Sequence, residues 1–442
     1  MGNHNEVFFK MKTNIIYKLL QDNNFKLSTD SRQITGGEIF FALQGDNFDG
    51  NKFARDALNR GALAAVIDNY EYKSGNCIPV KNVTEELQAV ARRYRNNFKI
   101  PVLAVTGSNG KTTTKEILAR VLSVNYKVHY TSGNLNNHIG VPLTLLACPL
   151  DADFMIVEMG ANHKGEIAKL CHTAEPGYGL VTNIGHAHLE GFGSLDGIVE
   201  AKSELYDYIE SIGGYVFYNE SNELLRNILV DKKVKKISYK EPGNHSLSVV
   251  EVQNNPMLEL LVDIDGEKYT YKTKLFGQHN LENIVAAVSV GMYFNIPPLE
   301  VKKAIESYIP DNNRSQVLET GNNTLICDSY NANPDSVSMS IESFRKYTGT
   351  NKILILGDML ELGEYETEEH KKILRELSSM DDLVEVILVG RVFNSLAPEY
   401  DMLSFETRDE LMKYLTDKPV RNSMVLVKAS RALGLEKIYS LF

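Results

Sequence analysis

Apolar residues recur along this chain in short runs, and the stretches between the runs have the spacing of amphipathic helices. Three runs in the middle of the chain, at 102–105, 154–158 and 179–183, are apolar at nearly every position. This pattern is typical of parallel strands that are buried on both faces. The sequence therefore predicts a doubly wound α/β sheet here, with ligands bound at the carboxyl ends of its strands.

The first 95 residues predict a smaller α/β unit. Helical spacing occurs at 15–21 and around 52–60, and apolar strands are expected at 39–43 and 64–67. Residues 246–252, 258–264 and 268–274 instead alternate polar and apolar positions. They predict antiparallel strands, with Asp265-Gly266 as a hairpin turn, before helical spacing returns at 280–294.

After Ile309-Pro310 the alternation of strands and helices starts again. It predicts strands at 324–327, 352–356, 384–389 and 424–427, with helices at 335–347 and 367–378. A chain of 442 residues is too long to fold around a single hydrophobic core. We therefore expect three domains with bounds near 1–95, 96–308 and 309–442.

Composition narrows the class of protein. A formal net charge of −10 argues against a nucleic-acid partner, whose binding surface would normally be basic. The cysteines (Cys77, Cys148, Cys171 and Cys327) lack metal-site or disulfide spacing, so we expect buried thiols in a reducing compartment. Residues 1–10 do not resemble a secretory signal, and no apolar run reaches about 18 residues. We expect a cytoplasmic protein without stable membrane insertion.

A phosphate-binding loop is predicted where the run at 102–105 meets Thr106-Gly-Ser-Asn-Gly-Lys-Thr112. Gly107 and Gly110 let the backbone approach phosphate oxygens, and a helix from Lys111 to about 123 directs N–H groups at the same anion. Lys111 would contact the β- and γ-phosphates, and the Thr112 hydroxyl would contact Mg²⁺. The alternative, an ordinary strand-to-helix turn, fits Gly-Lys-Thr-Thr poorly.

Further polar residues follow other predicted strands of the central sheet. Glu158 suits Mg²⁺, although a helix-capping or solvated surface carboxylate is the alternative. His186 and His188 face different ways, so we expect at most one of them to bind a cation. Lys202, taken alone, is best interpreted as a solvated surface lysine. In the site it would contact phosphate or become a carbamate.

Two polar loops do not have the pattern of packing segments. Thr131-Ser-Gly-Asn-Leu-Asn-Asn137 could hold a polyhydroxylated ligand, and a plain surface loop explains it almost as well. Asp328-Ser-Tyr-Asn-Ala-Asn-Pro334 follows the first strand of the third predicted domain, again at a carboxyl end.

Together these segments resemble the Mur ligases, the ATP-dependent amide-forming enzymes of peptidoglycan precursor synthesis, over nearly the whole chain. Residues 106–112 match the family's T-G-x-x-G-K-T loop, and Glu158, His188 and Lys202 match its strand-end glutamate, Mg²⁺-linked histidine and carbamoylated lysine. Gly277-Gln-His-Asn-Leu-Glu-Asn283 matches its adenine segment.

The branch that adds D-alanyl-D-alanine to a UDP-muramoyl tripeptide is most similar. It resembles this chain at 328–334 and at Leu356-Gly-Asp-Met-Leu-Glu-Leu-Gly363, with His370 following. The Asp-Asn-Pro-Arg motif of the diaminopimelate-adding relative is absent. One departure is Ala429, in Lys428-Ala-Ser-Arg431, where the family usually has glycine; we expect an effect on local backbone geometry only.

The resemblance implies a role for each matching residue. Catalytic roles fall to Lys111, Glu158, His188 and Lys202. Metal ligation falls to Thr112, Glu158, His188 and Lys202. ATP contacts are expected from Gly107, Ser108, Asn109, Gly110, Lys111, Thr112, Thr113, Asn280, Asn283, Arg314 and Asp328. The UDP substrate would be held by Ser31, Arg32, Asn47, Phe48, Asp49, Asn134, Asn136 and Asn137. The acceptor side would include Tyr330, Asn331 and Asn333.

The resemblance also implies an architecture and a reaction. A small N-terminal α/β domain would bind the UDP substrate, a central P-loop ATPase domain would bind ATP and two Mg²⁺ ions, and a C-terminal Rossmann-like domain would deliver the acceptor. The reaction would pass through an acyl phosphate, and we expect a monomer with a carbamoylated Lys202. A folylpolyglutamate synthase-like ligase and a non-catalytic nucleotide switch remain alternatives, and the third residue of the tripeptide stays open between lysine and diaminopimelate.

Overall fold

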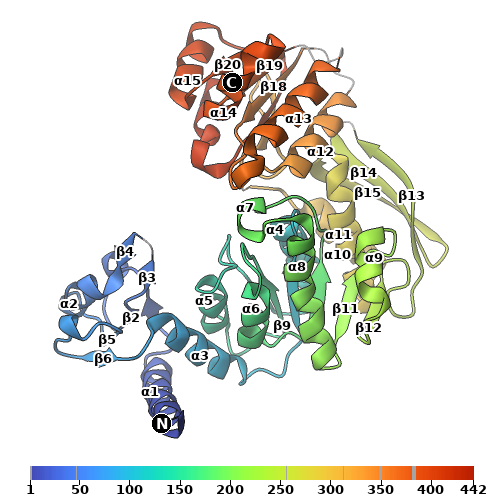
Figure 1. The fold of residues 1–442 in the computed structure, drawn as a ribbon. Coiled ribbons are helices and arrows are strands. Elements are labelled where there is room, and N and C mark those ends of the chain that lie inside the picture. The colour runs from blue at the N-terminus through green and yellow to red at the C-terminus, as the bar shows by residue number, and fades with distance from the viewer. Residues whose placement is uncertain (1, 46, 255, 312, 348–350, 381–384) are drawn as a thin grey trace. The chain divides into compact units, whose positions relative to one another are not determined.

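The protein is described by a computed structural model that covers residues 2–442 except 46, 255, 312, 348–350 and 381–384 (Figure 1). The chain forms two compact units. The first comprises Met1–Ala104, Lys127–Gly160 and Glu166–Gly177, and the second comprises Val105–Tyr126, Ala161–Gly165 and Tyr178–Phe442. No helix within the described part of the chain is both long enough and apolar enough to span a membrane.

The N-terminal region contains a four-stranded parallel sheet in the order β1-β2-β5-β6. Its strands are β1 (Leu27–Ser28), β2 (Ile39–Phe41), β5 (Ala64–Ile67) and β6 (Cys77–Pro79), and its helices are α1 (Gly2–Asp22), α2 (Ala54–Asn59) and α3 (Val83–Arg95). The predicted strand at 64–67 is confirmed, whereas α1 begins before the helical spacing at 15–21. A small antiparallel ribbon joins β3 (Gln44–Gly45) to β4 (Phe48–Asp49). Asp46, which directly precedes the predicted substrate residues Asn47, Phe48 and Asp49, lies outside the described residues.

The central sheet has six strands in the order β12-β11-β10-β7-β9-β8. These are β7 (Val102–Thr106), β8 (Val128–Tyr130), β9 (Phe154–Glu158), β10 (Tyr178–Val181), β11 (Tyr215–Tyr218) and β12 (Lys235–Ser238). All three apolar runs are strands, and every residue of β7 and β9 is buried. The helices are α4 (Lys111–Leu122), α5 (Gly140–Leu146), α6 (Glu166–Ala174), α7 (Leu189–Phe192), α8 (Leu195–Ser211) and α9 (Glu223–Val230).

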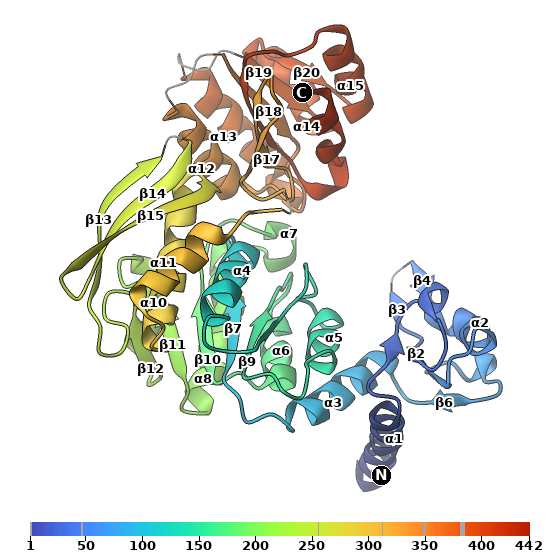
Figure 2. The ribbon, with the colours of Figure 1, turned by 180° about the vertical axis from the view of Figure 1, so that it is seen from behind.

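A three-stranded antiparallel sheet follows, made of β13 (Leu247–Asn254), β14 (Met257–Ile264) and β15 (Glu267–Phe276). The predicted turn between β14 and β15 is confirmed: Asp265 and Gly266 both have positive φ, 54° and 88°, as a two-residue hairpin of the primed kind requires. The chain then enters α10 (Leu281–Tyr293) and α11 (Pro298–Ser307), which pack on each other and on α4 (Figure 2).

The C-terminal sheet has the order β16-β17-β21-β18-β19-β20 and is parallel except at β16. Its strands are β16 (Gln316–Glu319), β17 (Thr324–Asp328), β18 (Lys352–Gly357), β19 (Glu385–Val389), β20 (Leu403–Phe405) and β21 (Met424–Lys428). α12 (Pro334–Arg345), α13 (Glu366–Ser378) and α14 (Arg391–Leu396) contact one another in sequence. Leu411 of α15 (Arg408–Asp417) packs against sheet residues such as Val425. The alternation of strands and helices that the sequence predicts after Pro310 is confirmed.

Short 3₁₀ helices complete the fold, and two of them adjoin the loops discussed below, Gln278–Asn280 and Arg431–Leu433. All four cysteines fall among the described residues and are buried thiols, as predicted.

Candidate active site

The phosphate loop connects β7 to α4 and requires glycine at two positions. Gly107 and Gly110 have φ values of 142° and 80°. A Cβ atom added to Gly107 would lie 2.0 Å from the Thr182 hydroxyl oxygen, and one added to Gly110 would lie 2.4 Å from Asn283 Oδ1. Both backbone conformation and lack of space therefore exclude a side chain there. The predicted glycine-flanked turn into a helix at Lys111 is confirmed.

The loop that follows β10 holds the phosphate loop from the side. The Ser108 N–H donates to the Asn183 carbonyl at 2.9 Å, and the Asn109 N–H donates to Asn183 Oδ1 at 2.9 Å. The Thr182 hydroxyl donates to the Asn109 carbonyl at 2.6 Å. Ser108 also exchanges hydrogen bonds with the backbone of Gly185. Sequence reasoning missed Asn183 as a support for this loop, although a polar residue directly after an apolar run was a usable signal.

Lys111 and the two residues after it begin α4. Lys111 Nζ donates to the carbonyls of Gly107 at 2.6 Å and Ser108 at 3.0 Å, so its ammonium lies over the loop. Thr112 and Thr113 are buried. The lysine charge and the N-terminal N–H groups of α4 make this an electropositive position suited to a phosphate group.

Two asparagines of the predicted adenine segment support the phosphate loop from its other side. Asn283 Oδ1 accepts from the Thr114 hydroxyl at 3.0 Å, and Asn283 Nδ2 donates to Asn280 Oδ1 at 2.9 Å. Asn280 Nδ2 in turn donates to the Phe276 carbonyl at 2.8 Å. Burial lowers the pKa of the neighbouring His279 to about 4, so its imidazole is neutral at physiological pH.

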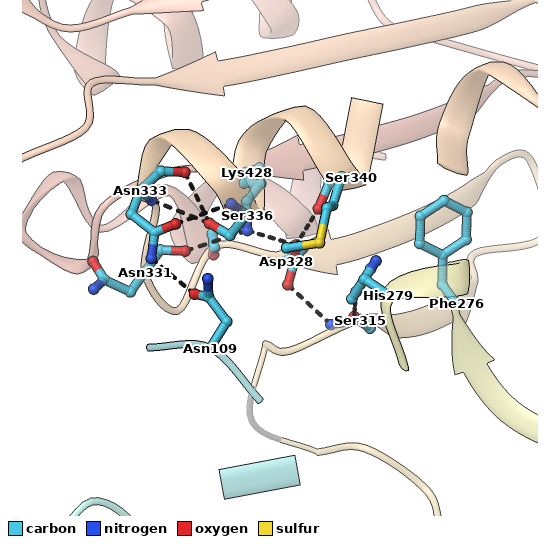
Figure 3. Close-up of polar contacts among 12 residues, drawn as sticks. Asn109, Phe276, His279, Ser315, Asp328, Asn331, Asn333, Ser336, Ser340 and Lys428 are labelled. Atoms are coloured by element: carbon cyan, nitrogen blue, oxygen red, sulfur yellow. Dashed lines mark hydrogen bonds and ion pairs between the residues drawn. The ribbon is translucent and has the colours of Figure 1, made fainter. Parts of the chain in front are cut away.

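Asp328, the last residue of β17, forms a buried ion pair with Lys428, the last residue of β21 (Figure 3). Asp328 Oδ2 accepts from Lys428 Nζ at 2.7 Å and from the Ser340 hydroxyl at 3.0 Å, and Oδ1 accepts from the Ser315 N–H at 3.1 Å. Burial alone would raise the pKa of Asp328, but the Lys428 ammonium and the hydrogen bonds from Lys428 and Ser340 outweigh it and lower the pKa. The carboxylate is therefore ionised and fully engaged.

The loop after β17 contacts the phosphate loop directly. Asn333 caps α12 by accepting from the Ser336 N–H at 2.9 Å, and its Nδ2 donates to Asn109 Oδ1 at 2.8 Å (Figure 3). Asn331 is exposed, and its carbonyl lies 3.4 Å from Lys428 Nζ. Two of the residues predicted for different substrates, Asn109 and Asn333, are thus in hydrogen-bond contact.

The two histidines after β10 pair with different carboxylates, in line with the expectation that they face different ways. His188 Nδ1 lies 2.5 Å from Glu361 Oε2, and this contact lowers the pKa of Glu361. The His186 N–H donates to Asp335 Oδ2 at 2.7 Å, and its Nδ1 lies 3.1 Å from Asp335 Oδ1. Sequence reasoning missed both carboxylates as partners, since only the folded chain brings them to the histidines.

His370 is buried and supports the loop that carries Glu361. Its Nε2 accepts from the Met359 N–H at 3.0 Å, and its Nδ1 lies 2.7 Å from the Glu366 carbonyl. Burial lowers the pKa of His370, which favours the neutral imidazole that these two bonds require.

The interpretation of Lys202 as a solvated surface lysine is wrong. Its residue surface is 2% exposed, and Nζ lies 5.4 Å from the centre of the Phe192 ring. The physical reason is helical phase: Lys202 lies four residues after Ile198 and three before Leu205, both buried on the inner face of α8. A lysine in this position is held away from bulk water.

Glu158 is also buried, so the alternative of a solvated surface carboxylate is wrong. Within the first unit its N–H donates to the Thr131 hydroxyl at 3.0 Å, and its Oε1 accepts from Asn136 Nδ2 at 2.8 Å. Asn134 is exposed. Asn137 Oδ1 instead accepts from the Gly140 N–H at 2.9 Å, at the start of α5. Of the three amides in this loop, only Asn136 contacts Glu158 in the structure.

The predicted UDP segments of the N-terminal region lie in two short elements. Arg32 is mostly exposed, and its guanidinium donates hydrogen bonds to the Asp30 carboxylate from Nε at 2.9 Å and from Nη2 at 2.8 Å. These bonds lower the pKa of Asp30 to about 2. Ser31 is buried beside it. Asn47, Phe48 and Asp49 belong to the β3–β4 ribbon, where the Phe48 ring is 55% exposed. An exposed aromatic residue and an exposed arginine in the same region suit a ligand with a planar base and phosphates.

The described residues contain no group of three or more His, Cys, Asp and Glu side chains arranged to hold a metal ion. The predicted metal set contains only two such residues, Glu158 and His188, and completes its ligands with the Thr112 hydroxyl and Lys202. The Thr112 hydroxyl and the Glu158 carboxylate are oxygen donors of the kind that Mg²⁺ prefers, whereas the His188 imidazole is a nitrogen donor. Lys202 fits a cation site only as an oxygen ligand, because its ammonium would repel the ion.

Ala429, the departure from the usual family motif, is accommodated by a glycine on the neighbouring strand. Ala429 is fully buried, and a Cβ on Gly357, at the end of β18, would lie 2.6 Å from the Ala429 Cβ. The methyl group therefore occupies space that the missing side chain of Gly357 leaves open.

Comparisons with known proteins agree with this architecture. Residues 26–104 match the domain described as "Mur ligase family, catalytic domain", residues 105–291 match the "Mur ligase middle domain", and residues 313–431 match the "Mur ligase, glutamate ligase domain". The chain is 32% identical over 436 residues to the UDP-N-acetylmuramoyl-tripeptide--D-alanyl-D-alanine ligase of Bacillus subtilis (strain 168), covering 93% of this chain and 92% of the relative.

Solved structures give the same result. A crystal structure of MurF from Acinetobacter baumannii superposes with a TM-score of 0.85 at 28% identity, covering 94% of this chain and 92% of that one. MurF from Thermotoga maritima, in complex with ADP, superposes with a TM-score of 0.81 at 28% identity, covering 94% and 96%. The sheets, the phosphate loop with its two glycines and the domain matches together show that the chain belongs to the Mur ligase family.

Proposed function

We propose that this protein joins D-alanyl-D-alanine to UDP-N-acetylmuramoyl-tripeptide at the expense of ATP, in peptidoglycan precursor synthesis. The observation that carries the proposal is the hydrogen bond from Asn333 to Asn109, at 2.8 Å. It places the loop after β17, expected to serve the acceptor, against the loop expected to hold the ATP phosphates. A ligase needs this arrangement, because the amine must reach the activated carboxyl group before water does. The full-length likeness to relatives of this name supports the same substrates.

In the first step, a terminal carboxylate oxygen of the tripeptide attacks the γ-phosphorus of ATP. A new O–P bond forms, the bond from the γ-phosphorus to the bridging oxygen breaks, and ADP leaves from an acyl phosphate. The Lys111 ammonium and the N–H groups at the start of α4 stabilise the negative charge on the transferring group. Catalysis by this chain therefore consists mainly of positioning and electrostatic stabilisation.

In the second step, the neutral amine of D-alanyl-D-alanine attacks the acyl carbon. The C–N bond forms, the C–O bond to phosphate breaks, inorganic phosphate leaves and the nitrogen loses a proton. Tyr330, Asn331 and Asn333 are the residues that we assign to the acceptor side, and Asn280, Asn283, Arg314 and Asp328 to ATP. Ser31, Arg32, Asn47, Phe48, Asp49, Asn134, Asn136 and Asn137 are assigned to the UDP substrate.

We assign magnesium binding to Thr112, Glu158, His188 and Lys202, with two sites and with Lys202 as a carbamate. Burial of Lys202 and Glu158 supports this, since a carbamate turns a buried cation into an anionic oxygen ligand. Magnesium would supply neutralising charge to the phosphoryl oxygens. The domain bounds that we propose are 1–95, 96–308 and 309–442. We expect a cytoplasmic monomer, and the third residue of its tripeptide substrate stays open between lysine and diaminopimelate.

The test is phosphate release and product mass with a panel of donors and acceptors. We expect turnover only when ATP, a UDP-muramoyl tripeptide and D-alanyl-D-alanine are all present, with a product whose mass is the sum of the two substrates less one water. Release that depends on folate and glutamate would favour a folylpolyglutamate synthase-like ligase. Nucleotide binding without a joined product would favour a nucleotide switch.

A further inference from the structure

The last strand of the chain carries a charged residue to the acceptor side of the C-terminal sheet. β21 lies between β17 and β18, and its last residue, Lys428, is in parallel register with Asp328 and Leu356. The chain that leaves β21 therefore emerges at the same edge as the loop that carries Tyr330. Ligands bind at this edge of doubly wound sheets.

Arg431 follows this strand end at the start of a 3₁₀ helix, and its only side-chain partner among the described residues is Tyr330. Arg431 Nη1 donates to the Tyr330 hydroxyl at 3.0 Å, and Cζ lies 5.0 Å from the ring centre. Arg431 is exposed. The neighbouring Ser430 is anchored, since its hydroxyl accepts from the Leu360 N–H at 2.9 Å. The guanidinium is therefore oriented by a fixed backbone and one phenol while most of its donors stay available.

A second guanidinium contacts the same phenol ring. Arg314 Cζ lies 3.6 Å from the centre of the Tyr330 ring, and Arg314 Nε is buried without a hydrogen-bond partner. Neither Arg314 nor Arg431 forms an ion pair with any carboxylate that the structure describes. Lys428, by contrast, is neutralised by Asp328 at 2.7 Å. Two like charges that share one ring repel each other, and bound anions relieve the repulsion.

Of the anionic groups in the proposed reaction, the ATP phosphates and the tripeptide carboxylate that attacks them meet at Lys111, which leaves the carboxylate of the acceptor dipeptide. Arg314 is assigned to ATP. Arg431 then remains for the carboxylate, which a guanidinium binds through two parallel N–H···O bonds. An extended dipeptide spans about 7 Å between its amine and its carboxylate, so the group that binds the carboxylate can stand apart from the reacting amine.

We propose that Arg431, held in place by Tyr330, binds the terminal carboxylate of D-alanyl-D-alanine and so selects acceptors that end in a free acid. This inference rests on the proposed function and adds a specificity-determining residue to it. Tyr330 acts as a positioning residue, since its hydroxyl and ring orient the guanidinium.

The test compares two acceptors, D-alanyl-D-alanine and its uncharged C-terminal amide, with the wild-type protein and Arg431→Ala. We expect the wild type to prefer the free acid by about 10- to 100-fold in kcat/KM, the effect typical of a charge-assisted hydrogen bond. Arg431→Ala should lose most of that preference by losing rate on the acid alone, with the KM for ATP and the UDP substrate unchanged. Arg431→Lys should keep part of the preference, because lysine keeps the positive charge but cannot make the two parallel hydrogen bonds of a guanidinium.

Arg421→Ala is the matched control, since this exposed arginine lies before β21 at the opposite end of the strand. It should behave as the wild type does. An Arg431→Ala variant that still prefers the acid by the wild-type factor, or that loses activity on the acid and the amide alike, contradicts the inference alone. A wild-type protein that joins neither dipeptide to the tripeptide contradicts the proposed function as well.

Discussion

At the residue scale, the phosphate loop shows how few side chains its geometry needs. Gly107 and Gly110 supply backbone conformation. Lys111 is only partly buried and its ammonium lies over the carbonyls of Gly107 and Ser108, so its side chain adds charge to the loop more than packing to the core. Function and stability are therefore separable at Lys111. Lys202 differs from Lys111 because it is buried, so the charge on its side chain affects both the chemistry of the site and the stability of the fold.

Lys111→Ala should lower kcat by at least about 100-fold while the protein remains folded, because the lost ammonium stabilises charge that develops in phosphoryl transfer. Turnover and a thermal melt on the same preparation would check this. The control is Lys127→Ala, which removes an exposed ammonium that pairs with Asp151 at 3.0 Å. Near-wild-type turnover in folded Lys111→Ala would contradict the phosphate-loop assignment.

Lys202→Ala should lose most activity if Lys202 is a carbamate, and short carboxylic acids or excess Mg²⁺ should restore part of it by replacing the lost oxygen ligand. Bicarbonate should not restore it. A fully active alanine variant, or a crystal structure whose lysine nitrogen carries no added carboxyl group, would remove Lys202 from the metal site.

At the scale of elements, the sequence predicts best what is buried on both sides. β7 and β9 are apolar at nearly every position because neighbours cover both faces, and both were predicted nearly to the residue. Edge strands such as β8, β12 and β20 were missed, since they are three or four residues long and partly exposed. For the candidate site, the sequence predicted the glycine turn that leads into α4 and the position of Glu158 at the end of β9. It could not place Asn183, Glu361 or the inner face of α8, which depend on helical phase and on long-range contacts.

The buried pair between β17 and β21 gives an element-scale prediction. Lys428→Met leaves Asp328 charged and without its cation, and we expect the C-terminal domain to lose about 3–5 kcal/mol of stability. Thermal unfolding would measure the loss, with exposed Lys413→Met as the control. Adding Asp328→Asn to Lys428→Met should recover part of it, because the uncompensated charge is removed. No recovery in the double variant would show that packing, not charge, causes the loss.

At the scale of the whole molecule, the proposed reaction assigns the three substrates to different regions of the chain. The UDP segments lie in the first compact unit, and the phosphate loop lies in the second. Contacts within the second unit, from Asn333 to Asn109 and from Glu361 to His188, join the loops after β17 and β18 to the phosphate loop and the loop after β10. A variant should therefore change mainly the kinetics for the substrate that is assigned to the region it alters.

Arg32→Ala should raise the KM for the UDP substrate by about 10-fold or more, with little effect on the KM for ATP, because a guanidinium contact to phosphate is lost in one region only. Steady-state kinetics with each substrate varied in turn would show the split. Arg60→Ala is a suitable control, since it removes an exposed arginine paired with Asp56 in the same region. A defect confined to ATP would mean that the N-terminal region has been assigned to the wrong substrate.

Asn283 carries a consequence for how variants of this protein should be interpreted. Its Oδ1 lies where a side chain on Gly110 would be, and the same amide is joined to Asn280. A substitution at Asn283 therefore alters the packing of the phosphate loop, even when the experiment measures only how the variant binds the purine. A mutational map that assigns each position to one part of the nucleotide will count the same packing defect at both positions. The effects of substitutions at positions 110 and 283 should therefore be strongly epistatic.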